Sequence, residues 1–495
     1  MRVLFINANE TWPPVVPLGL LQVAQAARSH GHWVDILDLC MHREMDRSRL
    51  VAQTLNDFRP DVVCLSVRNL DSANPEATGD SVAPLKDVVT TCQEISTALV
   101  AVGGSGFSIA PEEMLLEVGA DIGVHGDGES ALPELLGRLS ARQPISGLLG
   151  VVERSADGTA AISAPRRRTD AAWFAHPALD LIDLEAYLQL GGSGSVQSKR
   201  GCRFSCAYCT YPGLEGDHIR CASVDWVVAE VERLAAAGAK HFWFVDSVFT
   251  VPEGHAVSVC KELHRRGLPE HITWSAYATP LGFTAELAER MRRAGCVELI
   301  FGTDAACTQS LRGLRKPFRP SHVASATQYA KGAGLDFAHH LLFGGPGETV
   351  ETVKETLEFM AALDCRLGLD AGIRIYPNTP IERTARKQGI IGQETNLLEP
   401  RFYVSRHVEN VLDDILLSFC RSVPRTRFFG RDGKPHPYTD PRLVEVYRRG
   451  FVGPYWAVLD EYERTTGACS ASDPLSRPIS DSVPETGRVA AAAAY

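Results

Sequence analysis

The chain has 495 residues, a formal net charge of −10 at pH 7 and a sequence pI near 5.9. A chain of this length exceeds what one hydrophobic core supports, so we expect two or three domains. The acidic balance, with no basic run longer than residues 166–168, argues against a protein that coats nucleic acid. We therefore expect a small-molecule or peptide substrate and no nucleic-acid partner.

The 13 cysteines are an odd number without regular spacing, which indicates a reducing compartment and not a disulfide framework. The opening sequence MRVLFI predicts a strand and not a signal peptide. No apolar run approaches the roughly 20 residues of a membrane-spanning helix. These features predict a cytoplasmic protein with no membrane partner.

Residues 1–150 alternate apolar runs with amphipathic stretches, which predicts an α/β domain with a doubly wound parallel sheet. The expected strands are residues 3–6, 33–37, 61–66, 99–102 and 121–124. Ligands bind at the carboxyl ends of such strands. The candidate ligand-binding residues in those loops are Pro17, Leu18, Gly19, Ser66, Arg68, Asn69, Gly103, Gly104, Ser105, Gly106, Gly126 and Glu129. The first loop lacks G-x-G-x-x-G, so a nicotinamide cofactor is not expected.

The pattern loosens over residues 151–190, which we interpret as a linker. Residues 191–390 repeat strand then helix, with a helix from Ser223 to Gly238. The expected strands are one before Cys202 and residues 241–245, 272–278, 297–301, 335–343 and 373–376. Six such units predict a partial (β/α)6 barrel with its function at the carboxyl strand ends. We expect a mostly helical substrate-binding cap over residues 391–467 and a disordered tail over 468–495.

Three cysteines lie in one loop as C-x-x-x-C-x-x-C: Cys202, Cys206 and Cys209. A 4Fe-4S cluster takes four thiolates, so three leave one iron open to a ligand from outside the protein. A zinc site, with Cys221 as the nearest further cysteine, needs four ligands and usually two close pairs. The remaining alternative is three buried thiols that only pack.

These cysteines, with Tyr208 before the third, resemble the signature of the radical S-adenosylmethionine (SAM) superfamily. The resemblance implies that the three thiolates hold irons and that SAM chelates the fourth iron. It also places Asp246 near the methionine amino group, Asp304 near the ribose, and Gly344, Gly345 and Glu348 beside the adenine. Helix caps and a tight turn are the alternative roles for these residues. Tyr277 and Arg374 are candidate catalytic residues on the substrate side, with packing or ion pairing as the alternative.

The strand-end loops of residues 1–150 are similar to the cobalamin-binding domain that precedes many radical SAM domains. No D-x-H-x-x-G histidine follows the first strand, so we expect no histidine below the cobalt. Arg68 is a candidate for that face, and pairing with Asp71 is its alternative. Methylthiotransferases hold a second cluster on three cysteines of their first domain; of the three here, Cys40, Cys64 and Cys92, the first two fall in apolar runs typical of a core.

Together the resemblances imply a cobalamin-dependent radical SAM methyltransferase with a 4Fe-4S cluster, SAM and cobalamin. Its implied reaction methylates an unactivated carbon or a phosphorus centre through methylcobalamin and a 5'-deoxyadenosyl radical. An external one-electron reductant of the flavodoxin or ferredoxin type is the implied partner. The alternatives are a cyclase or ring-rearranging enzyme without net methyl transfer, and a non-catalytic cobalamin or redox sensor.

Overall fold

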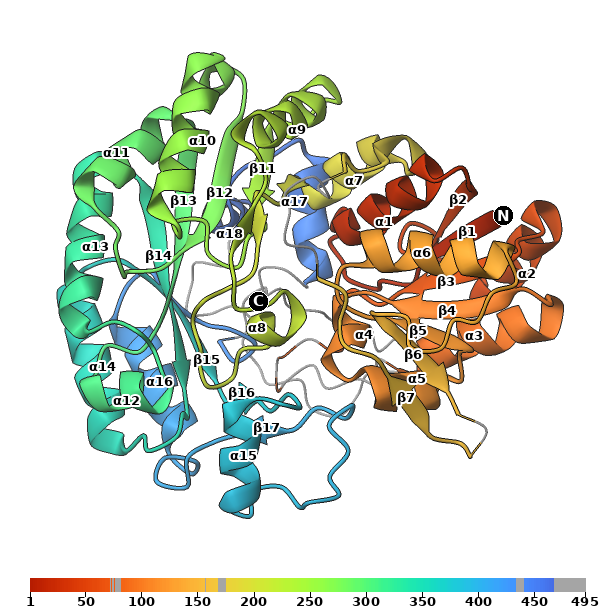
Figure 1. Cartoon of the computed structure of the whole chain (residues 1–495). Coiled ribbons are helices and arrows are strands. Elements are labelled where there is room, and N and C mark those ends of the chain that lie inside the picture. The colour runs from red at the N-terminus through yellow and green to blue at the C-terminus, as the bar shows by residue number, and fades with distance from the viewer. Residues whose placement is uncertain are drawn as a thin grey trace.

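The computed structural model describes residues 1–71, 73, 75, 82–155, 157–167, 175–432 and 440–466 (Figure 1). The tail predicted over residues 468–495 lies outside this range. No helix in these ranges is long and apolar enough to cross a lipid bilayer.

The first sheet has the strand order β2-β1-β3-β4-β5-β6-β7, and the strands from β2 to β5 are parallel. The strands are β1 (Arg2–Asn7), β2 (Trp33–Asp38), β3 (Val62–Ser66), β4 (Leu99–Gly103), β5 (Ile122–Val124), β6 (Val151–Arg154) and β7 (Ala160–Ile162). The doubly wound sheet is confirmed. The antiparallel strands β6 and β7 extend it into the segment predicted as a linker.

Alternation along the central strands explains why helices cover both faces of this sheet. Val3 and Phe5 belong to one hydrophobic cluster, and Leu4 and Ile6 belong to another. Successive side chains of a strand point to opposite faces, so a strand with apolar residues at every position needs cover on both sides. The helices are α1 (Leu18–Ser29) and α6 (Gly128–Ser140) on one face, α2 (Arg47–Phe58), α3 (Ala83–Ile95) and α5 (Pro111–Val118) on the other, and the short α4 (Ser105–Ile109) after β4.

The second sheet curves into a partial barrel with the order β18-β15-β14-β13-β12-β11-β8, all parallel. Its strands are β8 (Gly194–Val196), β11 (His241–Phe244), β12 (Thr273–Ala278), β13 (Cys296–Asp304), β14 (Asp336–Phe343), β15 (Arg366–Ala371) and β18 (Thr426–Phe428). The outer helices are α9 (Val224–Ala236), α10 (Glu253–Arg265), α11 (Ala285–Arg293), α12 (Thr308–Gly313), α13 (Pro320–Ala333), α14 (Val350–Ala362) and α16 (Leu412–Ser422). Figure 1 shows α11, α13 and α14 on the side away from the first sheet.

The sixth barrel strand differs from the prediction, because it is β15 and not residues 373–376. Gly368 and Asp370 interrupt the apolar pattern of β15, which hides the strand in the sequence. A Cβ at Gly368 would lie 2.6 Å from the Phe429 ring, so packing requires the glycine. Ile373–Arg374 instead forms β16, a two-residue antiparallel ladder with β17 (Phe402–Tyr403). The seventh strand, β18, was not predicted.

The C-terminal helices α17 (Val444–Arg448) and α18 (Tyr455–Thr466) pack into the barrel interior. The segment predicted as a cap, residues 391–467, also supplies α16 and β18 to the barrel, and its substrate-binding role stays a prediction. Trp456 packs there in one cluster with Ile300 of β13. The buried Glu298 carboxylate accepts hydrogen bonds from the backbone N–H groups of Tyr455, at 3.0 Å, and Trp456, at 2.9 Å. The start of α18 is thereby anchored inside the barrel, near the amino end of β13.

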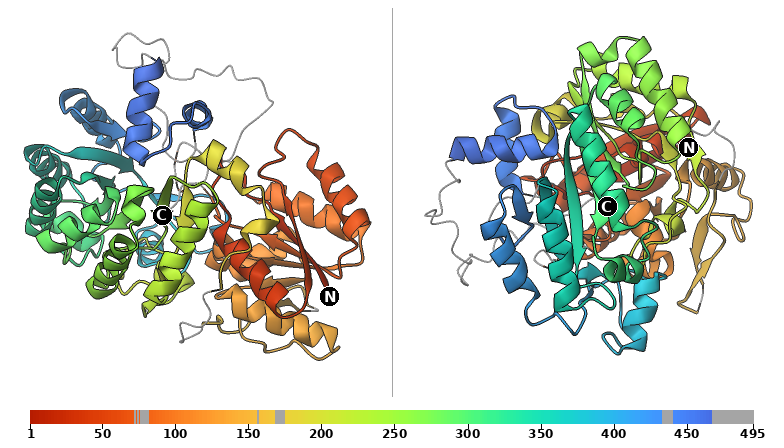
Figure 2. Two further views of the ribbon diagram at one scale, coloured as in Figure 1. Left: turned by 90° about the horizontal axis from the view of Figure 1, so that it is seen from above. Right: turned by 90° about the vertical axis from the view of Figure 1, so that its left-hand side faces the viewer.

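The carboxyl ends of the two sheets face each other. The helix α7 (Leu184–Gly191) connects the two units, and Figure 2 shows them side by side in the view from above. The short α8 (Tyr211–Leu214) follows the cysteine loop, lies between the sheets in Figure 1 and contacts α4 of the first sheet. Two remaining short strands, β9 (Lys199–Arg200) and β10 (Arg220–Cys221), flank the cysteine loop, and α15 (Pro380–Lys387) lies beside it.

Candidate active site

The loop with the three cysteines runs from β9 to α8, and close backbone contacts hold its start. Gly201 has φ +95°, and a Cβ there would lie 2.2 Å from the carbonyl oxygen of His218. Only glycine fits this position. The Cys202 N–H donates to the carbonyl of Gly216 at 3.0 Å. The first cysteine is therefore placed by the main chain.

The middle of the loop is held from two other parts of the barrel. The Ala207 N–H donates to the carbonyl of Leu314 at 2.9 Å, after α12, and the Ala207 carbonyl accepts from the Ile381 N–H at 2.8 Å, in α15. The loop is thereby fixed without help from its cysteine side chains, which stay available as ligands.

The three thiols suit a cluster better than a single metal ion. Burial raises the pKa of Cys209 to about 12 and also raises that of Cys206, so both thiols depend on a bound metal to become thiolates. Among the described residues, no three His, Cys, Asp or Glu side chains converge as one metal ion requires. In a cubane cluster each thiolate binds a different iron. The zinc alternative with Cys221 would need four such ligands around one point.

A buried polar triad lies beside the cysteine loop. Tyr208 Oη donates to Asp304 Oδ2 at 2.5 Å, and Lys316 Nζ lies 2.8 Å from the same oxygen. Asp304 has φ +61° at an irregularity between β13 and β14, which turns its side chain toward the loop. Lys316 was missed in the sequence, because no motif marks it. The contact of Asp304 with the ribose stays a prediction.

Asp246, which follows β11, is fully buried and holds β9. Its carboxylate accepts from the Ser198 N–H at 2.7 Å, the Ser198 hydroxyl at 2.6 Å, the Lys199 N–H at 3.2 Å and Lys199 Nζ at 2.8 Å. Both carboxylate oxygens are therefore engaged within the protein. The predicted contact with the methionine amino group stays untested, and the structure adds a positioning role.

The turn Gly344-Gly345-Pro-Gly-Glu348 after β14 is shaped by its own glutamate. Glu348 Oε2 accepts from the N–H groups of Gly344, at 2.5 Å, and Gly345, at 3.2 Å, and Ser310 Oγ donates to Oε1 at 3.0 Å. Burial raises the pKa of Glu348 to about 7. The adenine contact predicted for this turn stays a prediction.

The loop after β3 carries Arg68 and rests on the glycines that follow β4. A Cβ at Gly104 would lie 2.3 Å from the carbonyl oxygen of Val67. A Cβ at Gly106 would lie 2.5 Å from the backbone of Asn69. Ser105 Oγ donates to the Arg68 carbonyl at 2.5 Å. The glycine-rich turn therefore serves to support the Arg68 loop.

The Arg68 side chain lies between the two units. Burial lowers its pKa, and the groups that act on its charge include Tyr211, from α8, and Tyr277, at the end of β12. No carboxylate in the described part of the chain forms an ion pair with Arg68. The alternative pairing with Asp71 is not found, because Asp71 has another partner.

That partner is Arg374, which crosses between the units. Arg374 Nε donates to Asp71 Oδ2 at 2.7 Å, and Tyr376 Oη donates to Asp71 Oδ1 at 3.0 Å. The two charged side chains are 2% and 3% exposed. Arg374 therefore forms an ion pair, the role that the sequence left open as the alternative to catalysis. The half-buried Tyr277 lies with its ring 5.5 Å from that of Trp243.

Comparison with known proteins agrees with this two-part site. Residues 2–136 match the B12 binding domain family, and residues 196–360 match the Radical SAM superfamily. A tryptophan 2-C-methyltransferase of Streptomyces laurentii is 27% identical over 452 residues, covering 78% of this chain and 74% of the relative. An uncharacterised methyltransferase of Pyrococcus horikoshii is 28% identical, covering 73% and 77%. The chain is a cobalamin-dependent radical SAM enzyme of the methyltransferase type.

A solved structure shares the complete fold of this cobalamin-dependent radical SAM enzyme. The radical SAM methyltransferase TsrM of Kitasatospora setae, with tryptophan and a SAM analogue bound, superimposes with a TM-score of 0.85 at 22% identity. The match covers 94% of this chain and 98% of TsrM. The likeness extends beyond residue 360, where the Radical SAM match ends.

The first domain of this radical SAM enzyme has features that fit a cobalamin. Its strand order reverses between β1 and β3, where doubly wound sheets bind ligands. Asn9, in the loop after β1, has a buried Nδ2 without a partner among the described residues, so a donor is left for a ligand. Gly19 is exposed, with open space where a Cβ would stand. Asn9 was not predicted.

The remaining predicted cobalamin residues are placed as follows. Pro17 and Leu18 lie at the start of α1, Ser66 ends β3 and Gly103 ends β4. A Cβ at Gly126 would lie 2.5 Å from the carbonyl oxygen of Arg166, so this glycine permits a backbone contact. Glu129 pairs with Arg200 of the barrel unit. Direct cobalamin contacts of these residues stay predictions.

A second cluster of the methylthiotransferase kind does not fit. Cys64 and Cys92 belong to hydrophobic clusters on opposite faces of the first sheet. Burial raises the pKa of Cys40, Cys64 and Cys92 to about 12 each. These cysteines are core residues, as their apolar surroundings in the sequence indicated for the first two.

Proposed function

We propose that the protein transfers a methyl group from SAM to a carbon atom of a small molecule. The observation that carries this proposal is that α8, which directly follows the cysteine loop, contacts α4, whose Ser105 supports the Arg68 loop. Two relatives with carbon targets in their names add support: the tryptophan enzyme above and a hopanoid C-3 methylase of Methylococcus capsulatus, 26% identical over 332 residues.

The residues divide between the cofactors by position. Cys202, Cys206 and Cys209 would hold the cluster, and the loops with Asn9 and Arg68 would hold cobalamin. When bound, the cluster supplies electrons and an iron that binds SAM, and cobalamin supplies a metal that can accept a methyl group and release it to the substrate.

The chain's own groups then set the environment of that transfer. Arg68 is a cation without a lone pair, so it cannot ligate a metal. Lys316 places a positive charge beside the cysteine loop, paired with Asp304. Tyr277 and Trp243 offer aromatic surface near the barrel's carboxyl end. Such rings stack well on a flat apolar substrate.

We further propose an aromatic substrate, with tryptophan and substituted indoles as the first compounds to test. The support is the name of the tryptophan relative and the aromatic pair Trp243 and Tyr277. An external one-electron reductant of the flavodoxin or ferredoxin type completes the proposal. Arg203, Arg312 and Arg315 are exposed cations on or next to the cysteine loop that suit an acidic partner.

The test is anaerobic reconstitution with iron, sulfide and cobalamin, followed by turnover with trideuteromethyl-SAM and mass spectrometry. A substrate that gains the labelled methyl group, with S-adenosylhomocysteine formed in step, supports methyl transfer. Formation of 5'-deoxyadenosine with a substrate of unchanged carbon count supports the cyclase alternative; an anaerobic magnesium-protoporphyrin cyclase of Cereibacter sphaeroides is 25% identical over 414 residues. No SAM consumption with bound cofactors supports the sensor alternative.

A further inference from the structure

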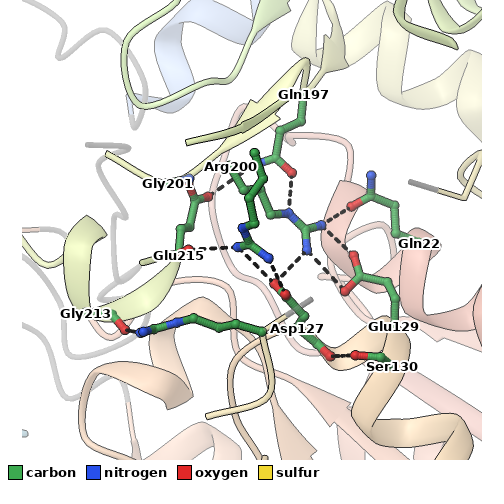
Figure 3. A network of polar contacts seen from close by, with 11 residues as sticks. Gln22, Asp127, Glu129, Ser130, Gln197, Arg200, Gly201, Gly213 and Glu215 are labelled. Carbon is green, nitrogen blue, oxygen red and sulfur yellow. Dashed lines mark hydrogen bonds and ion pairs between the residues drawn. The ribbon is translucent and has the colours of Figure 1, made fainter. Parts of the chain in front are cut away.

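A buried group of charges connects the first sheet to the start of the cysteine loop. Arg200 lies two residues before Cys202, and its Nη2 donates to Glu129 Oε1 at 2.5 Å and to Gln22 Oε1 at 2.7 Å. Its Nη1 donates to Glu129 Oε2 at 3.1 Å, so the guanidinium engages both carboxylate oxygens (Figure 3). A bidentate pair of this kind fixes direction as well as distance.

A second arginine, on β10, also pairs with a carboxylate of the first domain. Arg220 Nη1 donates to Asp127 Oδ2 at 2.5 Å, and its Nη2 donates to the carbonyl of Glu215 at 2.7 Å. Asp127 and Glu129 stand at the amino end of α6, where negative charge is favourable. The arginine side chains are each 10% exposed, and the Asp127 and Glu129 side chains 4% and 6%. Two cations of the barrel unit thus converge on two anions of the cobalamin-binding domain.

Within the barrel unit, Glu215 links Gln197, the partner of Arg200, to the residue before the first cysteine. The Gly201 N–H donates to Glu215 Oε2 at 2.9 Å, and Gln197 Nε2 donates to Oε1 at 3.1 Å. Gln197 Oε1 accepts in turn from Arg200 Nε at 2.8 Å. Figure 3 shows these side chains gathered around one point, with the cysteine loop on one side and α6 on the other. A shift of Arg200 therefore displaces the residue next to Cys202.

We propose that Glu129 and Arg200 are positioning residues that set the cysteine loop at its working distance from the cobalamin-binding domain. The inference rests on the proposed function only for the identity of the reaction, not for the positioning of the loop. Both Glu129 oxygens are engaged by Arg200, so under this proposal the carboxylate serves as an anchor and the cobalamin contact expected from the sequence is not needed. A misplacement of about 1 Å can cost about a hundredfold in rate. Buried ion pairs are weak sources of net stability, which favours the geometric role.

The test uses the full-length holoenzyme with Glu129→Gln, which keeps the shape of the side chain and removes its charge. Glu134→Gln is the matched control, because Glu134 is on the same helix and its more exposed carboxylate pairs with Arg166 at 3.0 Å and Arg138 at 3.3 Å, not with Arg200. We expect Glu129→Gln to speed hydrogen exchange over residues 201–216 about tenfold, because that segment loses its anchor. Cobalamin affinity should stay within about threefold, since Glu129 makes no cobalamin contact, and the control should match the wild type.

Turnover adds a second readout. In Glu129→Gln we expect kcat to fall at least about tenfold with KM nearly unchanged, because alignment is lost while substrate contacts remain. Arg200→Lys keeps the charge without the bidentate geometry, so its kcat should lie between that of Arg200→Gln and that of the wild type. The double variant Glu129→Gln/Arg200→Gln should disturb exchange no more than the worse single variant, because the two residues act as one unit.

Several results would overturn the proposal. Weaker cobalamin binding in Glu129→Gln, with unchanged exchange over residues 201–216, would make Glu129 a cobalamin contact. Additive effects in the double variant would show that the pair does not act as a unit. Exchange, iron content and cobalamin affinity are measured without substrate, so failure to find a methylated product leaves this test intact.

Discussion

Two of the buried ion pairs that join the units differ in which cofactor loop they hold. Arg200 belongs to the start of the cysteine loop and is anchored by Glu129 of the first domain. Asp71 belongs to the loop that carries Arg68 and is anchored by Arg374 of the barrel unit. Each cofactor loop is therefore fixed by a residue of the opposite unit. Neither cofactor loop is therefore held by its own domain alone.

The largest effect is expected from replacing the cysteines of the loop that the Glu129–Arg200 pair holds. Cys202→Ala, Cys206→Ala or Cys209→Ala should each abolish cluster assembly and SAM cleavage, because a cluster with one open iron needs all three thiolates. Cobalamin binding by the first domain should remain. Cys221→Ala is the matched control and should keep its iron. Iron analysis and visible absorbance check this, and loss of the cluster in the Cys221 variant would contradict the three-ligand assignment.

Breaking the Asp71–Arg374 pair should instead weaken cobalamin binding and leave the cluster in place. Asp71→Asn leaves the Arg374 charge buried and uncompensated, which typically costs about 3–5 kcal/mol. We expect a lower thermal midpoint and weaker cobalamin binding, because the Arg68 loop loses its support. Iron content should stay close to that of the wild type. Calorimetry, cobalamin titration and iron analysis measure these effects.

Its control is Asp180→Asn, which breaks an exposed pair with Arg28. Exposed pairs contribute about 0–1 kcal/mol, so this variant should unfold within a few degrees of the wild type. An Asp71 variant that lost its cluster but kept cobalamin would reverse our assignment of the two anchors.

Much of the fold could be predicted because local patterns determine it. The strands of the first sheet are short apolar runs separated by amphipathic helices, and Ser223 and Gly238 bracket α9 (Val224–Ala236). The strand β15 was misplaced because Gly368 and Asp370 obscure it. Its glycine is required by a contact with Phe429, about 60 residues later, which no local pattern shows.

The site shows the same limit. The three cysteines are close in sequence, so their chemistry is visible there. Asp71 and Arg374 are 303 residues apart, and the sequence offered Arg68 as the nearer partner for Asp71. The glycines after β4 indicated a special loop in the sequence. The reason for Gly104, a close contact with the backbone of Val67, is visible only in the fold. Contacts across the interface are set by tertiary structure and escape motif analysis.

Arg68 tests whether the second anchored loop acts on the cobalt. Arg68→Ala should alter cobalt reactivity by about tenfold or more and spare cluster assembly, because no cluster contact involves this residue. Electron paramagnetic resonance of the cob(II)alamin form of the wild type should show no nitrogen splitting, since no histidine stands in the loop after β1. Nitrogen splitting in the wild type would refute the expectation that no histidine lies below the cobalt, and Arg68→Lys separates charge from shape.

The smallest effect on the reaction is expected from an anchor that touches neither cofactor loop. Glu298 holds the start of α18 inside the barrel, and burial raises the pKa of its carboxyl to about 8 despite the hydrogen bonds from Trp456 and Tyr455. A raised pKa means that the folded state binds this proton more tightly than the unfolded state, where the value is near 4.5. Stability from this proton is therefore full below about pH 4.5 and is lost as the pH rises toward 8.

Glu298→Gln carries a permanently neutral group in the same place. We expect the stability advantage of the wild type over Glu298→Gln to shrink steadily between about pH 5 and pH 8, because only the wild type loses a proton there. Thermal midpoints measured across this range provide the test, and cobalamin affinity and iron content should not change. A constant difference between the two proteins would mean that Glu298 is ionised throughout. A loss of either cofactor would show that the cap, too, is coupled to the interface that Arg200 and Arg374 cross.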